Sequence, residues 1–366
     1  MSSRRSPGRS TCRRRTSDPG VVSTGRRTLV LAGFAVLLVV GTFVSASVGQ
    51  LPVGPRDVAG AMLHGIGIDT SWRPDDTIIE QTLLQIRFPR VAMSILVGAT
   101  LAVAGAVMQA IFGNPLAEPG VVGVSAGAAL GASIAIAFGI TAFAGWGVAV
   151  LAFVGGFAAT VLVYATARVG GRTEVVTLLL TGIAVNAFAG AGLALVMFAS
   201  DTGSREQIVF WQLGSMNGSR WSEVLIVAAV GLPACVVACL LARRYDLLSL
   251  GERTAAHLGL RVERLRIGSI LLVALLTGVA VAFAGIISFV GLVVPHLVRM
   301  LLGPSHRTLL LASVIGGAAL LVWADLLART LVSGSDLPIG LLTSLIGGPF
   351  FFYLVRATRS KAGGWA

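Results

Sequence analysis

Charged side chains are scarce in this sequence of 366 residues. Only 12% of the residues are Asp, Glu, Lys or Arg, whereas 55% are hydrophobic. Soluble globular proteins carry about 25% charged residues, which they need to cover a surface that faces water. The composition therefore excludes an ordinary soluble domain of this length.

Lysine, histidine and cysteine are scarcer still. The single lysine is Lys361, near the C-terminal end, so the chain lacks the lysine that a phosphate-binding nucleotide loop requires. The four histidines are scattered without metal-ligand spacing, and the three cysteines do not make a disulfide framework. We find no nucleophile motif, and we expect no catalytic residue, no bound metal and no cofactor.

The few charges lie in clusters that long apolar stretches separate. The uncharged stretches are 28–50, 91–117, 119–167, 175–200, 224–242, 267–298, 308–324 and 337–355. A bilayer core about 30 Å thick requires roughly 20 apolar residues per helix. Only helices and closed barrels satisfy their backbone polar groups in lipid, and these stretches are too long for barrel strands. They predict an all-α polytopic membrane protein.

Two of the stretches, 119–167 and 267–298, are long enough for two helices each, which gives ten spans and places both termini on one side. On that side lie 21 of the 28 Lys and Arg residues, and seven lie on the other. Positively charged loops remain in the cytoplasm. We therefore expect cytoplasmic N- and C-termini, and we interpret the net charge of +12 as topology rather than as nucleic-acid binding.

The predicted spans also divide the chain. Residues 1–28 form a basic tail that we expect to be disordered on the cytoplasmic side, where it could touch anionic membrane lipid. Residues 29–357 form one ten-helix domain, and residues 358–366 form a cytoplasmic C-terminal tail.

A run of small residues recurs at an offset of 180 residues. It aligns Gly98 with Gly278 and Pro115 with Pro295. Small residues allow helices to approach closely in a membrane. In the ten-helix topology the two runs point in opposite directions, so the match predicts an inverted repeat of helices 2–5 and 7–10. Chance matching in a chain rich in Ala and Gly is the alternative.

The span centres hold almost no ionisable residue. Asp325 is the exception, and its simplest explanation is an i,i+4 ion pair with Arg329. Ion-coupled carriers usually place such residues inside the bundle. A secondary carrier is therefore the weaker alternative, and energy for transport must come from a separate ATPase.

The longest predicted cytoplasmic loop is 243–266. Within it, residues 248–259 predict a short helix with small residues on one face, closed by Gly259 as a C-cap. Such a helix can be a connector, or it can dock into a groove of a partner protein.

The order of motifs resembles that of the iron-siderophore and cobalamin importer permeases over residues 29–357. The motifs are RFPR at 87–90, NPLAEP at 114–119, GIAVN at 182–186, WQLGS at 211–215, LGE at 250–252, GIISFVGL at 285–292, VPHLVR at 294–299, LPIG at 337–340 and GGPF at 347–350. The resemblance implies a permease that dimerises around a central path in a bacterial inner membrane. It also implies a second permease subunit, two cytosolic ATP-binding subunits and an extracytoplasmic substrate-binding protein, which can be a lipoprotein.

The resemblance further implies roles for individual residues. Arg87, Arg90 and Arg329 match outward-facing arginines that receive acidic residues of the binding protein. The loop that contacts the ATPase matches Gly251, Glu252, Ala255 and Gly259.

The fifth span, including Asn186, would line the path, and the cytoplasmic gate would lie at Glu174, Val175 and Val176. At this gate the family carries small hydroxyl residues, so the chain departs from the pattern here. We expect an iron(III)-siderophore cargo, with cobalamin or haem as alternatives.

Overall fold

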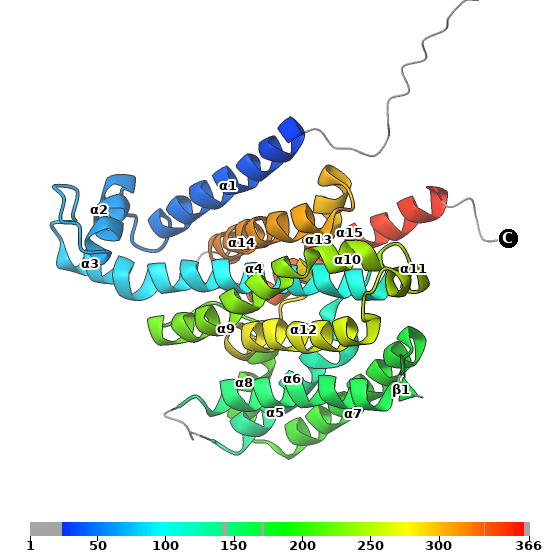
Figure 1. The fold of residues 1–366 in the computed structure, drawn as a ribbon. Coiled ribbons are helices and arrows are strands. Elements are labelled where there is room, and N and C mark those ends of the chain that lie inside the picture. Colours follow the sequence, from blue (N-terminus) through cyan, green and yellow to red (C-terminus); the bar gives the residue numbers. More distant parts are fainter. Residues whose placement is uncertain (1–23, 141–144, 170–171, 333, 362–366) are drawn as a thin grey trace, which may run out of the picture.

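The computed structural model describes residues 24–140, 145–169, 172–332 and 334–361. Within these residues the regular elements are helices apart from one two-stranded hairpin (Figure 1). Seven helices are long and apolar enough to cross a membrane, and three further apolar helices are shorter. These ten helices coincide with the ten predicted spans, so the all-α polytopic fold is confirmed.

The chain divides into two halves at the loop after α7. The first half contains α1 (Thr24–Ser47), α2 (Pro55–Gly65), α3 (Thr77–Thr82), the π-helix η1 (Leu83–Arg87), α4 (Phe88–Phe112), the 3-10 helix η2 (Pro119–Val122), α5 (Val124–Ala137), α6 (Gly147–Thr166), β1 (Arg168–Val169), β2 (Arg172–Thr173) and α7 (Val175–Ala199). The second half contains α8 (Thr202–Leu213), α9 (Trp221–Leu240), α10 (Ala242–Leu248), α11 (Glu252–His257), α12 (Val262–Ala284), α13 (Val290–Leu302), α14 (His306–Thr330) and α15 (Ile339–Lys361). Helices α2, α3 and α8 lie between predicted spans and were not expected from the sequence.

Helix α4 forms the centre of the bundle. It packs against α14, α12, α9 and α13, and nearly all of its residues from Val97 to Ile111 are buried. Its glycines explain how closely the helices approach: a Cβ atom on Gly98 would lie 2.2 Å from the carbonyl oxygen of Gly317 in α14. The predicted small-residue packing is therefore present at this contact.

The packing of the two halves supports the inverted repeat. Helix α4 of the first half packs against α14 and α13 of the second half. Its counterpart in the second half, α12, packs against α6 and α5 of the first half, which are the counterparts of α14 and α13. In Figure 1, α4 runs from α3 towards the end that carries α11, whereas α12 runs away from α11. The offset of 180 residues does not extend past these helices, however. Pro115 lies in the turn after α4, whereas Pro295 lies inside α13, so the two prolines are not equivalent.

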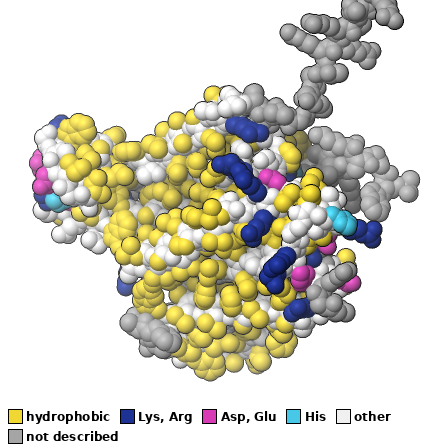
Figure 2. Space-filling model, viewed as in Figure 1, with side chains coloured by type: hydrophobic (Ala, Val, Ile, Leu, Met, Phe, Trp, Pro, Cys, Tyr) yellow, Lys and Arg dark blue, Asp and Glu magenta, His cyan; other side chains and the backbone are white. Residues whose placement is uncertain are grey.

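The two ends of the bundle differ in charge. In Figure 1, the start of α1 and the end of α15 lie at the end that carries α10, α11 and β1, and α2 and α3 lie at the opposite end. On the face shown in Figure 2, hydrophobic side chains cover the middle of the bundle, and most Lys and Arg side chains gather towards the end with α10 and α11. This distribution is the one that the basic-residue count in the sequence predicts.

Candidate functional site

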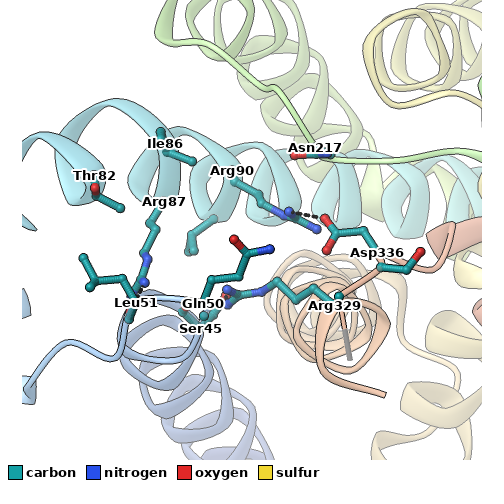
Figure 3. Close-up of a pocket in the computed structure, with 14 residues that line it drawn as sticks. Ser45, Gln50, Leu51, Thr82, Ile86, Arg87, Arg90, Asn217, Arg329 and Asp336 are labelled. Carbon is teal, nitrogen blue, oxygen red and sulfur yellow. Dashed lines mark hydrogen bonds and ion pairs between the residues drawn. The ribbon is translucent and has the colours of Figure 1, made fainter. Parts of the chain in front are cut away.

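The largest cavity that we describe lies at the end with α2 and α3, and it contains the three predicted docking arginines. Its volume is about 660 Å³, and it is lined by the end of α1, by η1, by the start of α4 and by the segment around the end of α14. Figure 3 shows Arg87, Arg90 and Arg329 converging on it from three elements. The structure thus brings together residues that are up to 242 positions apart in the sequence.

Arg87 holds the C-terminal end of α1. It is only 7% exposed, and its Nη1 donates to the carbonyl oxygens of Ala46 at 2.6 Å and Ser47 at 3.0 Å, while Nη2 donates to the carbonyl of Leu51. The last carbonyls of a helix have no partner inside the helix and carry partial negative charge. Arg87 therefore acts as a cap that fixes α1 beside α4.

A π-helix directs Arg87 towards this position. The N–H of Phe88 donates to the carbonyl of Leu83, five residues earlier, and Pro89 follows. Because proline has no N–H, the next carbonyl in this pattern, that of Leu84, receives no backbone hydrogen bond from Pro89. The indole Nε1 of Trp221 in α9 donates to it instead, at 2.7 Å. The contribution of Trp221 to this turn was not visible in the sequence.

Arg90 forms the ion pairs of the cavity. Its Nε donates to both carboxylate oxygens of Asp325 at 3.0 Å, its Nη2 lies 2.9 Å from Asp325 Oδ1, and its Nη1 donates to Asp336 at 2.8 Å. The Asp325 side chain is only 1% exposed, so water does not stabilise its negative charge. The Arg90 guanidinium therefore supplies most of the stabilisation that this buried carboxylate requires. The predicted pair of Asp325 with Arg329 is present at 3.8 Å, but it is secondary.

Arg329 reaches the same helix end as Arg87. Its Nη2 donates to the carbonyl of Ser45 and to the Ser45 hydroxyl at 2.9 Å, and its Nη1 donates to the carbonyl of Val48. Both arginines thus combine a structural hydrogen bond with a position on the cavity wall. Three guanidinium groups and one carboxylate, that of Asp336, line this cavity, and buried Asp325 pairs with Arg90 behind its wall, so an excess of positive charge remains.

The opposite end of the bundle carries the predicted ATPase-contacting loop. The predicted single helix over 248–259 is divided: α10 ends at Leu248 and α11 begins at Glu252, because Gly251 adopts a φ of +98° that favours glycine. Gly259, with a φ of +85°, follows the end of α11 as expected. Gly251, Glu252 and Gly259 are exposed, but Ala255 is fully buried and supports the loop from inside.

Two contacts fix this loop to the membrane helices. The Tyr245 hydroxyl lies 2.9 Å from Ser269 Oγ in α12, and burial raises the pKa of Tyr245 to about 12, so the phenol stays neutral. Asp246 accepts hydrogen bonds from the backbone N–H of His306 at 2.8 Å and from its ring Nδ1 at 2.9 Å, at the start of α14. The loop is therefore rigidly attached at its α10 end.

The predicted gate residues lie at the same end, where the hairpin leads into α7. Glu174 is the N-cap residue of α7 and accepts a hydrogen bond from the Thr177 hydroxyl at 3.1 Å, and Val176 is 68% exposed. The Asn186 side chain is half-buried and donates to the carbonyl of Gly120 in η2 at 3.3 Å. Asn186 therefore contacts η2 inside this subunit.

Among the described residues, no cluster of three His, Cys, Asp or Glu side chains could hold a metal ion.

Comparisons with known proteins agree on one class of membrane protein. The model of the FecCD transport family matches residues 37–357. The hemin transport system permease protein HmuU of Yersinia pestis is 40% identical over 92% of this chain and 98% of its own length. The cobalamin import system permease protein BtuC of Halobacterium salinarum is 38% identical over 90% of this chain and 96% of its own length.

A solved structure shares the fold as well. It is an inward-facing conformation of an ABC transporter assigned to the metal-chelate type, with a TM-score of 0.79 and 33% sequence identity, and the match covers 90% of this chain and 99% of that one.

Proposed function

This chain belongs to the FecCD transport family, and on that premise we propose that it carries iron(III)-siderophore complexes across a bacterial cytoplasmic membrane. The family consists of multi-pass permease subunits of ABC importers, which have no ATPase site of their own and work with ATP-binding subunits and a substrate-binding protein. The chain is a transporter component and not an enzyme.

The observation that carries the proposed cargo class is the set of relatives matched over nearly their full length. They transport large chelates: hemin, cobalamin and, in a Bacillus subtilis relative that is 38% identical, iron(3+)-hydroxamate. Haem is the second candidate, because the hemin permease is 40% identical to this chain. Each of these cargoes is too large for a path between the helices of one subunit, which supports a path between two permease subunits.

The arginine-lined cavity is our candidate docking site for the binding protein. Guanidinium groups bind carboxylates with two parallel hydrogen bonds, and the three guanidinium groups here have two neighbouring carboxylates, Asp336 in the cavity wall and Asp325 buried behind it. The surface around it belongs to the end that the basic-residue count assigns to the outside. We therefore assign Arg87, Arg90 and Arg329 to the reception of acidic side chains, and we infer that docking competes with the contacts that these arginines make to α1, Asp325 and Asp336.

The exposed part of the loop at the other end is our candidate contact with an ATP-binding subunit, and we expect two such subunits in the transporter. Gly251, Glu252 and Gly259 present backbone and one carboxylate at the surface, and buried Ala255 supports them. The start of α7, with Glu174, Val175 and Val176, is our candidate gate. Helix α7 is mostly apolar and leaves Phe188 and Phe198 exposed, and we assign the second permease subunit, identical or related, to this side.

Reconstituted transport tests the function. The permease is placed in liposomes with its ATP-binding subunits and its binding protein, and uptake is compared for a radiolabelled iron(III)-hydroxamate, haem and cobalamin. We expect ATP-dependent uptake of the iron chelate, and no uptake when the ATPase carries a substitution that blocks hydrolysis. Uptake that persists without hydrolysis would establish a secondary carrier, and uptake of haem or cobalamin alone would replace the proposed cargo.

Docking is tested separately by association kinetics with the binding protein. Charge pairs at the rim of an interface act mainly on the association rate, which then depends strongly on salt. We expect the double substitution Arg87→Glu and Arg90→Glu to slow association most at low ionic strength, and acid-to-Lys changes on the binding protein to restore part of the rate. Arg205→Glu, outside the cavity, is the matched control. Equal salt dependence for the cavity variant and the wild type would exclude this docking site.

A further inference from the structure

One buried arginine connects the candidate ATPase loop with the candidate gate. Arg266 lies in the first two turns of α12 and is 5% exposed. Its Nη2 donates to the carboxylate of Glu252, the first residue of α11, and its Nη1 donates to the carbonyl of Thr173 at 2.9 Å. Thr173 ends β2 and immediately precedes the N-cap of α7. A single guanidinium thus touches both segments.

A second carboxylate holds the same threonine. Glu263, one turn before Arg266 in α12, accepts hydrogen bonds from the Thr173 hydroxyl and from its backbone N–H at 3.3 Å. The Glu263 carboxylate also lies 3.9 Å from Arg266 Nη1, beyond hydrogen-bond distance. The Glu263 carboxylate is therefore hydrogen-bonded to Thr173, while Arg266 donates its charge-assisted hydrogen bond to Glu252.

The two carboxylates differ in their freedom to move. The Glu252 side chain is 59% exposed and lies on the candidate ATPase loop, whereas the Glu263 side chain is 27% exposed and belongs to a membrane helix. A buried guanidinium that loses its only hydrogen-bonded carboxylate is strongly destabilised. Since Glu263 is already nearby, withdrawal of Glu252 would draw the Glu263 carboxylate from Thr173 to Arg266.

From this geometry we propose that Arg266 is a positioning residue that relays movement of α11 to the start of α7 by an exchange of carboxylates. When the ATP-binding subunit displaces Glu252, Arg266 takes Glu263 as its partner, and Thr173 loses the two hydrogen bonds that hold the hairpin against α12. The proposal rests on the proposed function for the assignment of α11 and of the gate, but the network itself lies within this chain.

Amide hydrogen exchange in the full-length permease tests the relay without any cargo. We expect Glu252→Gln to speed exchange of the amides at 173–178 by about tenfold, because the start of α7 then opens locally more often. In an Arg266→Gln background, Glu252→Gln should have no further effect, because no guanidinium remains to draw Glu263 from Thr173. Arg264→Gln, an exposed arginine two residues away, is the matched control and should leave exchange unchanged.

Unchanged exchange at 173–178 in Glu252→Gln, or additive effects in the double variant, would overturn the relay. The amides of α4, which is buried along most of its length, report on global opening in both variants. In the reconstituted complex, Arg266→Gln should keep ATP hydrolysis but raise the ATP consumed per iron(III)-hydroxamate transported; an equal loss of both activities would also contradict the relay. A wild-type complex that fails to transport this probe would refute the cargo, while the exchange result would still stand.

Discussion

Asp325 illustrates how single residues in this chain serve the membrane environment. A carboxylate that is 99% shielded costs several kcal/mol unless a partner compensates its charge, and Arg90 supplies three short contacts to it. Arg87 and Arg329 solve a different problem, because they neutralise the carbonyls at the end of α1 where no following helix turn can do so. The three arginines are therefore structural as well as candidates for docking.

The Arg90–Asp325 pair leads to the first prediction. Arg90→Gln should lower stability by about 3–5 kcal/mol, because it leaves Asp325 buried and uncompensated. The double substitution Arg90→Gln and Asp325→Asn should recover most of the loss, since it removes both charges. Thermal unfolding in detergent checks this, with Arg205→Gln as an exposed control. Equal melting temperatures for the single and double variants would contradict the buried pair.

At the scale of elements, the π-helix before α4 shows how one residue type creates a need that another satisfies. Pro89 leaves the Leu84 carbonyl without a backbone donor, and Trp221 from α9 supplies the missing hydrogen bond. The bond also fixes α9 against η1, directly before α4. The element therefore depends on a tertiary contact for its local geometry.

This leads to the second prediction. Trp221→Phe should cost about 1–3 kcal/mol, because a carbonyl loses its donor and the ring alone remains. Adding Pro89→Ala should reduce the loss, since alanine restores a backbone N–H at that position. The melting temperatures of the two single variants and the double variant form the test. Strictly additive changes would mean that the indole and the proline are not coupled through Leu84.

The third prediction concerns the contact between α4 and α14. Gly98→Ala would place a Cβ atom 2.2 Å from the Gly317 carbonyl oxygen, so the helices must separate. We expect a loss of about 1–3 kcal/mol from overpacking. Gly33→Ala in α1 has no atom within 4 Å of the added Cβ and should be neutral or slightly stabilising. If both variants melt alike, the close approach of the two helices is wrong.

At the scale of the whole molecule, the charge asymmetry, the inverted packing of the halves and the two candidate contact surfaces are arranged along one axis. The arginine cavity lies at one end, and the α11 loop with the hairpin lies at the other (Figure 1). Helix α4 extends between these ends and is buried along most of its length. A subunit of this shape can contact different partners at its two ends while its middle faces lipid.

The orientation of this axis gives the fourth prediction. We expect the cavity end to face outside and both termini to face the cytoplasm, because basic loops remain on the cytoplasmic side. In a background without the native cysteines, a membrane-impermeant thiol reagent applied to intact cells should label cysteines at positions 73 and 205 but not at 253 and 359. Labelling of all four positions after membrane disruption is the control. The reverse pattern in intact cells would invert the topology.

The sequence by itself determined the features that depend on the solvent. Ten spans follow from apolar length, because lipid admits only helices of sufficient length here, and the ordered motifs were enough to predict the permease family. The end of α11 before Gly259 follows from local backbone preference, whereas the break at Gly251 was missed because a positive φ there is not dictated by the neighbouring residues.

Only the tertiary structure decided which charges meet. Arg90 and Asp325 are 235 residues apart in the sequence, and Trp221 and Leu84 are 137 residues apart. No periodicity or spacing in the sequence links such distant positions. The tertiary structure also turned the three arginines proposed for docking inwards, buried Ala255 and joined Glu252 to Thr173 through Arg266. The physical reason is that a charge in a low-dielectric interior must find a partner wherever the packing of helices brings one, and the packing is a property of the whole chain.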